Sequence, residues 1–295
     1  MLTPDYLASC TDYLLGMYDA LQTSLMEDMA RRIVKTGTMT DTAAYQAKCV
    51  QTAGALMQDV TEKVANLTNL SNEEIERLFQ EAGVESMKND AQPLLKAGYD
   101  IDLTLSPAMS SQLEAAIKKT QGDMTNLTLT TGSTAAGQYL EATNKAYMMV
   151  TSGGFSYSDA IARAIKECAS EGNFVSYASG TKSRVDVAVR RSVLTAVNQT
   201  AAKMTESYSA DLGAEYYETS AHFGARPTHQ EWQGQVFKIE GSDRNYPNFA
   251  DSTGYGTGDG LCGWNCRHSF YPYWPDISER AYSEETLEEY ASKSY

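Results

Sequence analysis

The sequence predicts an α+β protein that is predominantly α, with long N-terminal helices followed by a small mixed α+β C-terminal module. Over most of the first 210 residues, apolar side chains recur every three or four positions, which is the period of an amphipathic helix. After residue 210 the chain changes to short runs of strand-forming residues such as Glu215–Ala221, and the stretch 241–275 is dense in Gly, Asn, Asp, Tyr and Pro. We therefore expect three consecutive regions: a helical N-terminal region over 1–120, a helical middle region over 121–210 and an α+β module over 211–295.

The N-terminal part is predicted to be one long helix over residues 4–35. Pro4 suits its first turn, where the N–H that proline lacks would have no partner inside the helix. The apolar face of this helix recurs at helical spacing: Cys10, Leu14, Met17, Leu21 and Leu25. Gly37 is expected to mark its end.

A second helix is expected to begin with a cap at Thr40 or Asp41 and to end near Asn69. Its apolar face is regular: Tyr45, Cys49, Ala53, Leu56, Val60, Val64 and Leu67. Residues 71–74, Ser-Asn-Glu-Glu, have the form of a capping box, in which the serine and the second glutamate satisfy N–H groups at a helix start. A third helix is therefore predicted from there to about Gly83.

Shorter helical pieces are expected after Glu85 and after Pro107. The segment 121–137 is rich in Thr, Gly and Asn, a composition typical of a loop or a short strand, and we interpret it as a hinge. Helical character resumes over 135–149, and Gly153-Gly154 is expected to break it.

The rest of the chain alternates periodic segments with turn residues. We predict helices over 156–169 and 182–204, a turn at Gly172 with an extended piece over 174–177, strands over 215–221 and 235–239, and a C-terminal helix after Ser283. The sequence stops at Tyr295 without a clear ending signal, so an extension of the native chain beyond this residue is an open expectation.

The chain has 38 acidic and 24 basic residues, which gives a formal net charge of −14. A charge of this sign repels a polyanion as a whole, although Arg190-Arg191 is a local basic spot. No stretch approaches the roughly 20 apolar residues that span a bilayer, and the N-terminus has no signal-peptide pattern. We therefore expect synthesis in a cytoplasm without secretion, and no membrane partner.

Five cysteines, an odd number, argue against a disulfide framework. Cys10, Cys49 and Cys168 lie in helix-like contexts and are expected to be small buried hydrophobic residues. The remaining two, Cys262 and Cys266, lie in the last quarter of the chain, where all three histidines lie between positions 222 and 268.

A metal hypothesis takes Cys262, Cys266 and His268 as ligands of a zinc ion, with His229 or His222 as a fourth ligand. Thiolate sulfur and imidazole nitrogen are the ligands that structural zinc prefers. The four-residue spacing of the cysteines differs from the Cys-x2-Cys of zinc knuckles, so a site without any cofactor is the favoured hypothesis and a zinc ion is the alternative. In that case the same residues are structural: Trp232, Trp264 and Cys266 fill the core, Arg226 and Arg267 pair with carboxylates or carbonyls, and His229 and His268 make buried hydrogen bonds.

Catalytic hypotheses find less support in the sequence. A pairing of either cysteine with a histidine and Asp259 matches no local thiol-enzyme signature. The loop Gly254–Gly260 lacks the Gly-Lys-Ser/Thr ending of a phosphate-binding loop, so a tightly turning loop is expected. Glu231 and His229 could form the acid/base pair of a hydrolase or nuclease, but no second carboxylate cluster accompanies them.

The stretches Ala225–Phe237 and Thr253–Pro275 resemble the tailed-bacteriophage minor capsid protein 2 family, which is similar in turn to minor head proteins of the Mu head-morphogenesis type. Those proteins also carry an Arg-x-x-His element and a later Cys-Arg-Cys or Cys-Arg-His element. Residues 152–157 and 189–200 also resemble the middle region of the family. The motif residues in this sequence are Arg226, His229, Trp232, Gly234, Cys262, Trp264, Cys266, Arg267 and His268.

The resemblance implies a structural component of the phage head, assembled in the host cytoplasm, and no catalytic activity. It implies a few copies inside the capsid at or near the portal vertex, with the helices of region 1–120 docked on the portal protein or on other capsid and scaffold proteins. The implied role is head assembly or DNA delivery. Two alternatives stay open: a metal-dependent hydrolase or nuclease in the C-terminal module, and an internal head protein that contacts packaged DNA.

Overall fold

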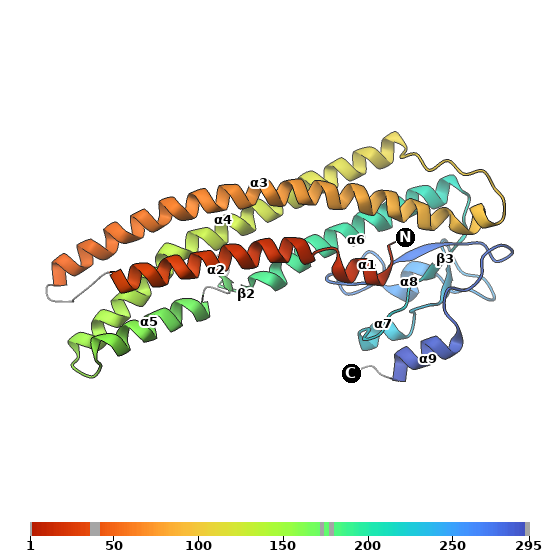
Figure 1. Cartoon of the computed structure of the whole chain (residues 1–295). Helices are drawn as coiled ribbons and strands as arrows, with labels where there is room; N and C mark the ends of the chain where they lie inside the picture. Colours follow the sequence, from red (N-terminus) through yellow and green to blue (C-terminus); the bar gives the residue numbers. More distant parts are fainter. Residues whose placement is uncertain (1, 36–41, 172–173, 177–179, 293–295) are drawn as a thin grey trace. The chain divides into compact units, whose positions relative to one another are not determined.

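The computed structural model describes residues 2–35, 42–171, 174–176 and 180–292 (Figure 1). Two compact units are assembled from separate stretches of the chain. Unit 1 comprises Met1–Asp12, Ile75–Thr120 and Arg190–Tyr295, and unit 2 comprises Tyr13–Glu74 and Gln121–Val189. Each unit thus combines elements from different parts of the sequence, whereas the three predicted regions follow the order of the elements along the chain.

The fold class is α+β and predominantly α, as the sequence predicts. Long helices supply most of unit 2: α2 (Asp12–Lys35), the first part of α3 (Thr42–Lys96), the later part of α4 (Pro107–Thr151) and α5 (Tyr157–Glu171). A short antiparallel pair, β1 (Phe174–Ser176) and β2 (Lys182–Arg184), precedes α6 (Val185–Asp211).

Tyrosine hydroxyls connect the helices of unit 2. Tyr18 on α2 donates to the carbonyl of Met124 on α4 at 3.3 Å, and Tyr45 on α3 donates to the carbonyl of Thr143 on α4 at 3.0 Å. Both tyrosine rings are buried. Because a buried hydroxyl without a partner costs free energy, these two bonds favour one register of the helices over others.

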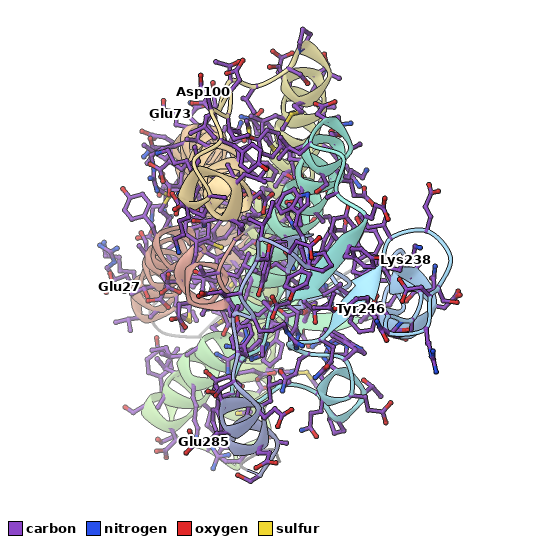
Figure 2. The ribbon with its side chains drawn as sticks, turned by 90° about the vertical axis from the view of Figure 1, so that its right-hand side faces the viewer. Glu27, Glu73, Asp100, Lys238, Tyr246 and Glu285 are labelled. Atoms are coloured by element: carbon purple, nitrogen blue, oxygen red, sulfur yellow. The ribbon has the colours of Figure 1, made fainter. Side chains whose placement is uncertain are left out.

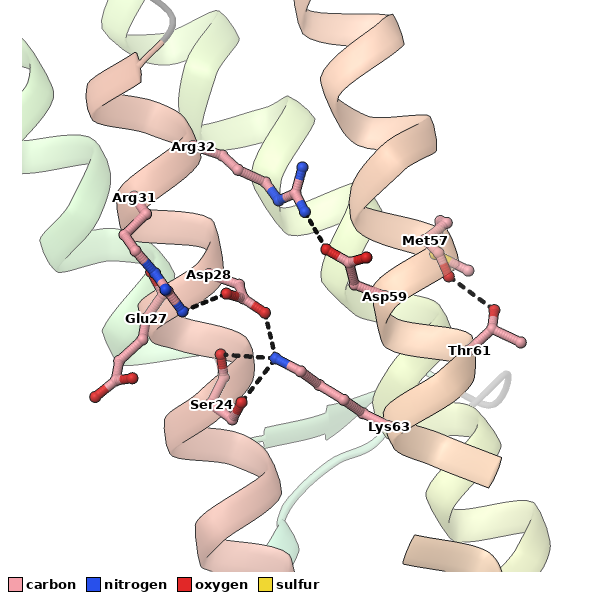
Figure 3. Close-up of polar contacts among 9 residues, drawn as sticks. All are labelled: Ser24, Glu27, Asp28, Arg31, Arg32, Met57, Asp59, Thr61 and Lys63. Atoms are coloured by element: carbon pink, nitrogen blue, oxygen red, sulfur yellow. Dashed lines mark hydrogen bonds and ion pairs between the residues drawn. The ribbon is translucent and has the colours of Figure 1, made fainter. Parts of the chain in front are cut away.

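Charged side chains also join α2 to α3 (Figure 3). Asp28 of α2 pairs with Lys63 of α3, whose ammonium group also donates to the Ser24 hydroxyl at 2.7 Å. Arg32 of α2 pairs with Asp59 of α3. Since these side chains are partly exposed, each pair contributes about 1 kcal/mol or less and mainly selects which helix faces meet.

The predicted single helix over residues 4–35 is two helices. The first, α1 (Pro4–Ser9), begins at Thr3, whose hydroxyl oxygen accepts from the N–H of Tyr6 at 3.2 Å. A break after Ser9 separates α1 from α2, while the apolar spacing continues across it. Periodicity alone therefore could not place the break. The predicted end at Gly37 and the predicted cap at Thr40 or Asp41 lie outside the described residues.

Helix α3 is continuous where the sequence predicts one helix to Asn69, another to about Gly83 and a shorter piece after Glu85. The predicted capping box at residues 71–74 is therefore wrong. Ser71 is fully buried, and its hydroxyl donates to the Thr68 carbonyl at 3.1 Å within the same helix. The serine thus satisfies its own hydroxyl inside the helix and caps nothing. No glycine or proline occurs between residues 69 and 74 to end the helix there.

The segment 121–137 was predicted to be a loop or strand that acts as a hinge, and it lies inside α4 instead. Its threonine hydroxyls donate to carbonyls one turn earlier in the same helix: Thr128 to Met124 at 2.8 Å, Thr130 to Asn126 at 2.7 Å and Thr131 to Leu127 at 2.9 Å. Threonine usually lowers helix stability because its hydroxyl competes for backbone partners. Here the hydroxyls find partners that leave the helical backbone intact.

Gly132 lies where α3 and α4 approach each other closely. A Cβ at this position would lie 2.6 Å from Cγ2 of Val64 and 3.0 Å from Cγ1 of Val60. These distances are shorter than side-chain contacts in packed interiors, so a residue without a side chain is required here. The glycine that suggested a flexible loop in the sequence is a packing residue in the structure.

Unit 1 contains a three-stranded antiparallel sheet of order β4–β3–β5: β3 (Tyr216–Thr219), β4 (Val236–Lys238) and β5 (Phe270–Tyr273). In the centre of the sheet Tyr217 pairs with Phe237 on one side and with Pro272 on the other. Three further helices follow β3 in the chain: α7 (Pro227–Gln230), α8 (Phe249–Thr253) and α9 (Glu284–Ser292).

An aromatic cluster forms the core beside this sheet. The Tyr217 ring lies 4.6 Å from the Phe270 ring and 5.0 Å from the Phe249 ring, measured between centroids. The rest of the cluster comprises Trp232, Phe237, Leu261, Cys262 and, from α6, Ala202. Burial of this much apolar and aromatic surface is the main stabilisation of the sheet and ties it to α6.

Several predicted elements are confirmed. Helix α4 ends at Thr151, before Gly153-Gly154, and α5 follows a cap at Ser156, whose hydroxyl oxygen accepts from the Asp159 N–H at 3.1 Å. The predicted strands over 215–221 and 235–239 are β3 and β4. In α9, the Ser283 hydroxyl oxygen accepts from the Thr286 N–H at 3.2 Å, as expected of a cap.

Other elements differ from the predictions, and two predicted features lie outside the described residues. Strand β5 was not predicted, because its sequence Phe-Tyr-Pro-Tyr contains a proline; the sheet tolerates Pro272 because β5 lies at its edge. The predicted helix over 182–204 begins at Val185, after β2, and continues to Asp211. The predicted turn at Gly172 and the end of the extended piece at Tyr177 lie outside the described residues.

Acidic side chains are exposed in both units. Figure 2 shows Glu27, Glu73, Asp100 and Glu285 directed away from the ribbon, in agreement with their exposure. These residues belong to the acidic excess that gives the chain its net charge of −14. Of the helices that the structure describes, none is both long enough and apolar enough to cross a membrane.

Replacing Gly132 with alanine is expected to lower the free energy of unfolding by about 1–3 kcal/mol, because the added methyl group overlaps Val60 and Val64. Gly137 in the same helix has no heavy atom within 4 Å of a Cβ at its position. Gly137→Ala is therefore expected to raise the free energy of unfolding by about 0.5–1 kcal/mol through helix propensity. Urea denaturation followed by circular dichroism measures both, and equal effects of the two substitutions would contradict the close approach.

Candidate functional site

The motif residues lie on two segments, Ala225–Phe237 and Thr253–Pro275, which meet beside helix α6 within unit 1. The side-chain amide of Asn198 on α6 donates to the carbonyl of Cys266 at 3.0 Å and to the carbonyl of His268 at 2.8 Å. The N–H of Asn265 donates to the Thr195 hydroxyl, also on α6, at 3.0 Å. Asn198 is buried, so the helix holds the segment 265–268 by bonds that water does not compete for.

The loop before this segment is packed backbone against backbone. A Cβ at Gly260 would lie 2.0 Å from the carbonyl oxygen of Gly254, and a Cβ at Gly263 would lie 2.3 Å from the carbonyl oxygen of Gly258. Gly254 also ends α8 with a left-handed conformation. The glycines of this loop thus allow a compact turn, as the sequence led us to expect.

His229 lies at the end of α7 and is buried. Its Nε2 lies 2.8 Å from the carbonyl oxygen of Asp259. Because a carbonyl can only accept, Nε2 carries the proton of the neutral ring and Nδ1 has a free lone pair. The backbone of the glycine-rich loop therefore fixes both the orientation and the tautomer of this histidine.

His268 is fixed in the same way by a side chain. Its Nε2 lies 3.1 Å from Oε1 of Gln233, and the same Oε1 accepts from the backbone N–H of His222 at 3.3 Å. The N–H of His222 identifies that atom as the amide oxygen, so His268 donates to it through Nε2. Nδ1 of His268 is consequently the ring atom with a lone pair.

The two free Nδ1 atoms face one thiol. Sγ of Cys266 lies 3.9 Å from Nδ1 of His229 and 3.7 Å from Nδ1 of His268. One ligand atom of each residue lies within 4.8 Å of the others, and all three residues are buried. We call His229, Cys266 and His268 the His–Cys–His group.

Cys262, predicted as a ligand in the same set, lies elsewhere. Its Sγ is 3.6 Å from the carbonyl oxygen of His268, and its side chain belongs to the aromatic core beside Leu261 and Phe270. Its backbone is left-handed, with φ of 58°, which is unusual for a residue other than glycine. The two cysteines thus differ in surroundings, although only three residues separate them.

His222, the other predicted alternative for a fourth ligand, is half-buried at the edge of the group. Its Nδ1 lies 2.8 Å from the carbonyl oxygen of Phe223, to which it donates. Its ring is 4.2 Å from that of His268, between centroids. The residue covers the group from one side and is not among its three converging ligands.

Burial sets the protonation of the group. It lowers the pKa of His229, and it lowers the pKa of His268 to well below the usual value, with the neighbouring His222 and His229 adding to that shift. Burial also raises the pKa of the Cys266 thiol. All three side chains are therefore neutral near pH 7, because a charge would be poorly solvated there.

A pocket of 310 Å³ opens beside the group, and three arginines line it together with His222, His229, Cys266 and His268. Arg226 donates to the carbonyl of Trp264 at 2.8 Å, as expected of a structural arginine. Arg190 donates to the carbonyl of Ala8 at 3.1 Å and lies 3.3 Å from Asp12. The third, Arg267, is half-buried, and none of the described lining residues is acidic, although the whole chain carries a net charge of −14.

The remaining motif residues have structural positions. Trp232 is buried, with its ring 4.7 Å from that of His229 and 4.8 Å from that of His268. Gly234 is left-handed, with φ of 64°, and a Cβ there would lie 2.6 Å from the Leu287 side chain. Trp264, expected in the core, is 61% exposed; that expectation is wrong, because the ring lies over Gly258 at the surface.

Sequence reasoning missed the residues that orient the group. Gln233 lies inside the Arg226–Gly234 motif but has no ionisable side chain that would draw attention to it. Asp259 contributes a backbone carbonyl, which no sequence pattern shows. Glu231, considered for an acid/base pair with His229, is exposed and does not belong to the His–Cys–His group.

These features define a helix-rich protein with a small α+β module at its C-terminal end, built around a buried His–Cys–His group. A family model described as phage minor capsid protein 2 matches residues 2–295. The chain belongs to this family, since the match covers essentially its whole length. The resemblance found in the C-terminal motifs is thereby confirmed. No curated protein and no solved structure matches the chain.

Asn198→Ala is expected to lower the free energy of unfolding by about 2 kcal/mol or more, because two buried carbonyls lose their donor. Gln199→Ala, at the exposed neighbouring position, is the matched control and is expected to change it by less than about 0.5 kcal/mol. Hydrogen exchange in the segment 262–268 should also become faster in the Asn198 variant. A stable variant with unchanged exchange there would show that the amide does not hold this segment.

Proposed function

We propose that this protein is a structural component of the phage head that binds at the portal vertex, inside the capsid. The observation that carries the proposal is the match of the minor capsid protein 2 family over residues 2–295. A minor capsid protein interacts with other phage structural proteins, and the portal protein and scaffold are the partners we propose. The role we assign is in head assembly or in DNA delivery.

Exposed apolar side chains support a docking role for the helical region 1–120. Single exposed apolar residues are ordinary, but several on long helices supply the surface that protein partners bury. In this region the helices carry Tyr13, Val34, Val50, Leu70 and Val84, and the segment between α3 and α4 carries Tyr99 and Leu103. Val34 and Val50 are 58% and 64% exposed, so substitution there leaves the core intact.

We further propose that the role is structural and not catalytic. The exposed Glu231 is not among the three converging ligands, so the hydrolase hypothesis lacks its base at the expected place. The net charge of −14 supports binding to proteins over binding along DNA, because phosphate contacts require basic side chains. Purified protein should accordingly leave plasmid DNA uncut in the presence of Mg²⁺ or Zn²⁺.

Purified virions are expected to contain the protein in a few copies, measured by quantitative mass spectrometry against the major capsid protein. Phage carrying Val34→Glu with Val50→Glu should incorporate several-fold less of it, because carboxylates would be buried against the partner. The matched control is Leu129→Glu with Met148→Glu, at equally exposed positions outside region 1–120. Virions without the protein would overturn the proposal, and equal incorporation of both double variants would overturn the assigned docking region.

Cross-linking of virions tests the proposed location at the portal vertex. Cross-links from region 1–120 to the portal protein are expected, because the proposal assigns docking to these helices. Cross-links confined to the major capsid protein would contradict the portal location while leaving a place in the head.

A further inference from the structure

We propose that Nδ1 of His229, Nδ1 of His268 and Sγ of Cys266 bind one zinc ion, and that a water molecule from the adjoining pocket completes the coordination. This site goes beyond the proposed role in the head, which requires no metal.

The hydrogen bonds of the group leave one acceptor without a donor unless a cation is bound. Both histidines use Nε2–H on Asp259 and Gln233, so both Nδ1 atoms are acceptors. Between them lies a single thiol, which has one proton for two lone pairs. A buried acceptor without a partner costs about 1–3 kcal/mol. A zinc ion accepts both lone pairs and the sulfur at once.

The sulfur–nitrogen distances of the group are close to those around a zinc ion. Zn–S and Zn–N bonds of about 2.3 and 2.1 Å at a tetrahedral angle separate sulfur and nitrogen by about 3.6 Å. The two sulfur–nitrogen distances in the group are 3.7 and 3.9 Å. The third separation, between the two ring nitrogens, lies within 4.8 Å. Two Zn–N bonds at a tetrahedral angle separate their nitrogens by about 3.4 Å, so rotation of the two imidazole rings must bring these atoms closer, by up to about 1.4 Å, as the ion binds.

The contacts around the ligands are those of a metal centre. Metal-bound histidines usually donate their second N–H to a carbonyl or carboxylate oxygen, which fixes the ring and makes the ligating nitrogen more basic. His229 and His268 both do so, to oxygens of Asp259 and Gln233. Trp232 packs on both rings, and Asn198 holds the backbone at either side of Arg267. The group is therefore oriented by its surroundings before any ion binds.

The donor set selects the metal. One thiolate and two imidazoles are ligands for zinc, whereas calcium and magnesium take oxygen ligands. On binding, Cys266 loses its thiol proton to solvent and the sulfur–zinc bond forms, while both imidazoles enter neutral. Cys262 takes no part, because its sulfur lies in the aromatic core.

Three protein ligands leave a fourth position, and the pocket beside the group supplies it. The three ligand residues line this 310 Å³ pocket together with Arg190, Arg226 and Arg267. Its lining includes the exposed Arg226 and Asn265, so water can reach the fourth position. The arginines favour an anion over water at that position when one is present.

Zinc analysis of the full chain tests the site. Protein expressed with added zinc and passed through gel filtration is expected to retain about one zinc per chain, measured by plasma mass spectrometry. Cys266→Ala should lose at least about ten-fold of this content, whereas Cys262→Ala, the matched control, should keep it. Wild-type protein without zinc would overturn the proposal, as would equal loss in both variants when circular dichroism shows that both are folded.

A measurement on the wild-type chain decides the matter if Cys266→Ala fails to fold. Cobalt-substituted protein is expected to show a thiolate-to-cobalt band in the near ultraviolet and strong visible bands of four-coordinate geometry. Sodium azide should shift the visible bands, because it displaces the exchangeable water. Absence of the thiolate band would overturn the site, and visible bands unchanged by azide would overturn the open fourth position.

Discussion

The two hydrogen bonds from Asn198 to the carbonyls of Cys266 and His268 are the constraint on which the C-terminal module depends. They attach an irregular segment to helix α6, which is regular and buried along one face. The segment then aims Cys266 towards the histidines while Cys262 joins the aromatic core. Because the amide is buried, it has no water to replace these partners, so the helix dictates the conformation of the motif.

Satisfaction of buried polar groups also explains why the helices are longer than the sequence predicts. Helical periodicity identified the buried face of α3 correctly and most of the buried face of α2, because burial of an apolar stripe is what stabilises a helix in a protein. The predicted ends of the helices were wrong where the local composition indicated an interruption. Ser71 and Thr128 return their hydroxyls to their own helices, and Gly132 is needed for contact with Val60 and Val64. Such roles depend on a neighbouring helix, which a local pattern does not contain.

The candidate site could be predicted in its residues and not in its geometry. Residue type drew attention to His229, Cys262, Cys266 and His268, since few side chains bind metals or transfer protons. Which cysteine faces the histidines depends on the backbone between them, where Cys262 and Asn265 are left-handed with φ of 58° and 56°. Gln233 and the Asp259 carbonyl orient the rings but carry no signature of their own.

A metal centre and a structural role in the head are compatible. The sheet of the C-terminal module has short strands of three or four residues, and loops rich in glycine connect its elements. Such a module buries a small core, and an ion that bridges α7 to the segment 266–268 would add stability where regular structure adds little. The ion would tie together two motif segments that are far apart in the sequence. The motif residues that carry the resemblance to the family would then be those that give the C-terminal module of this chain a fixed shape.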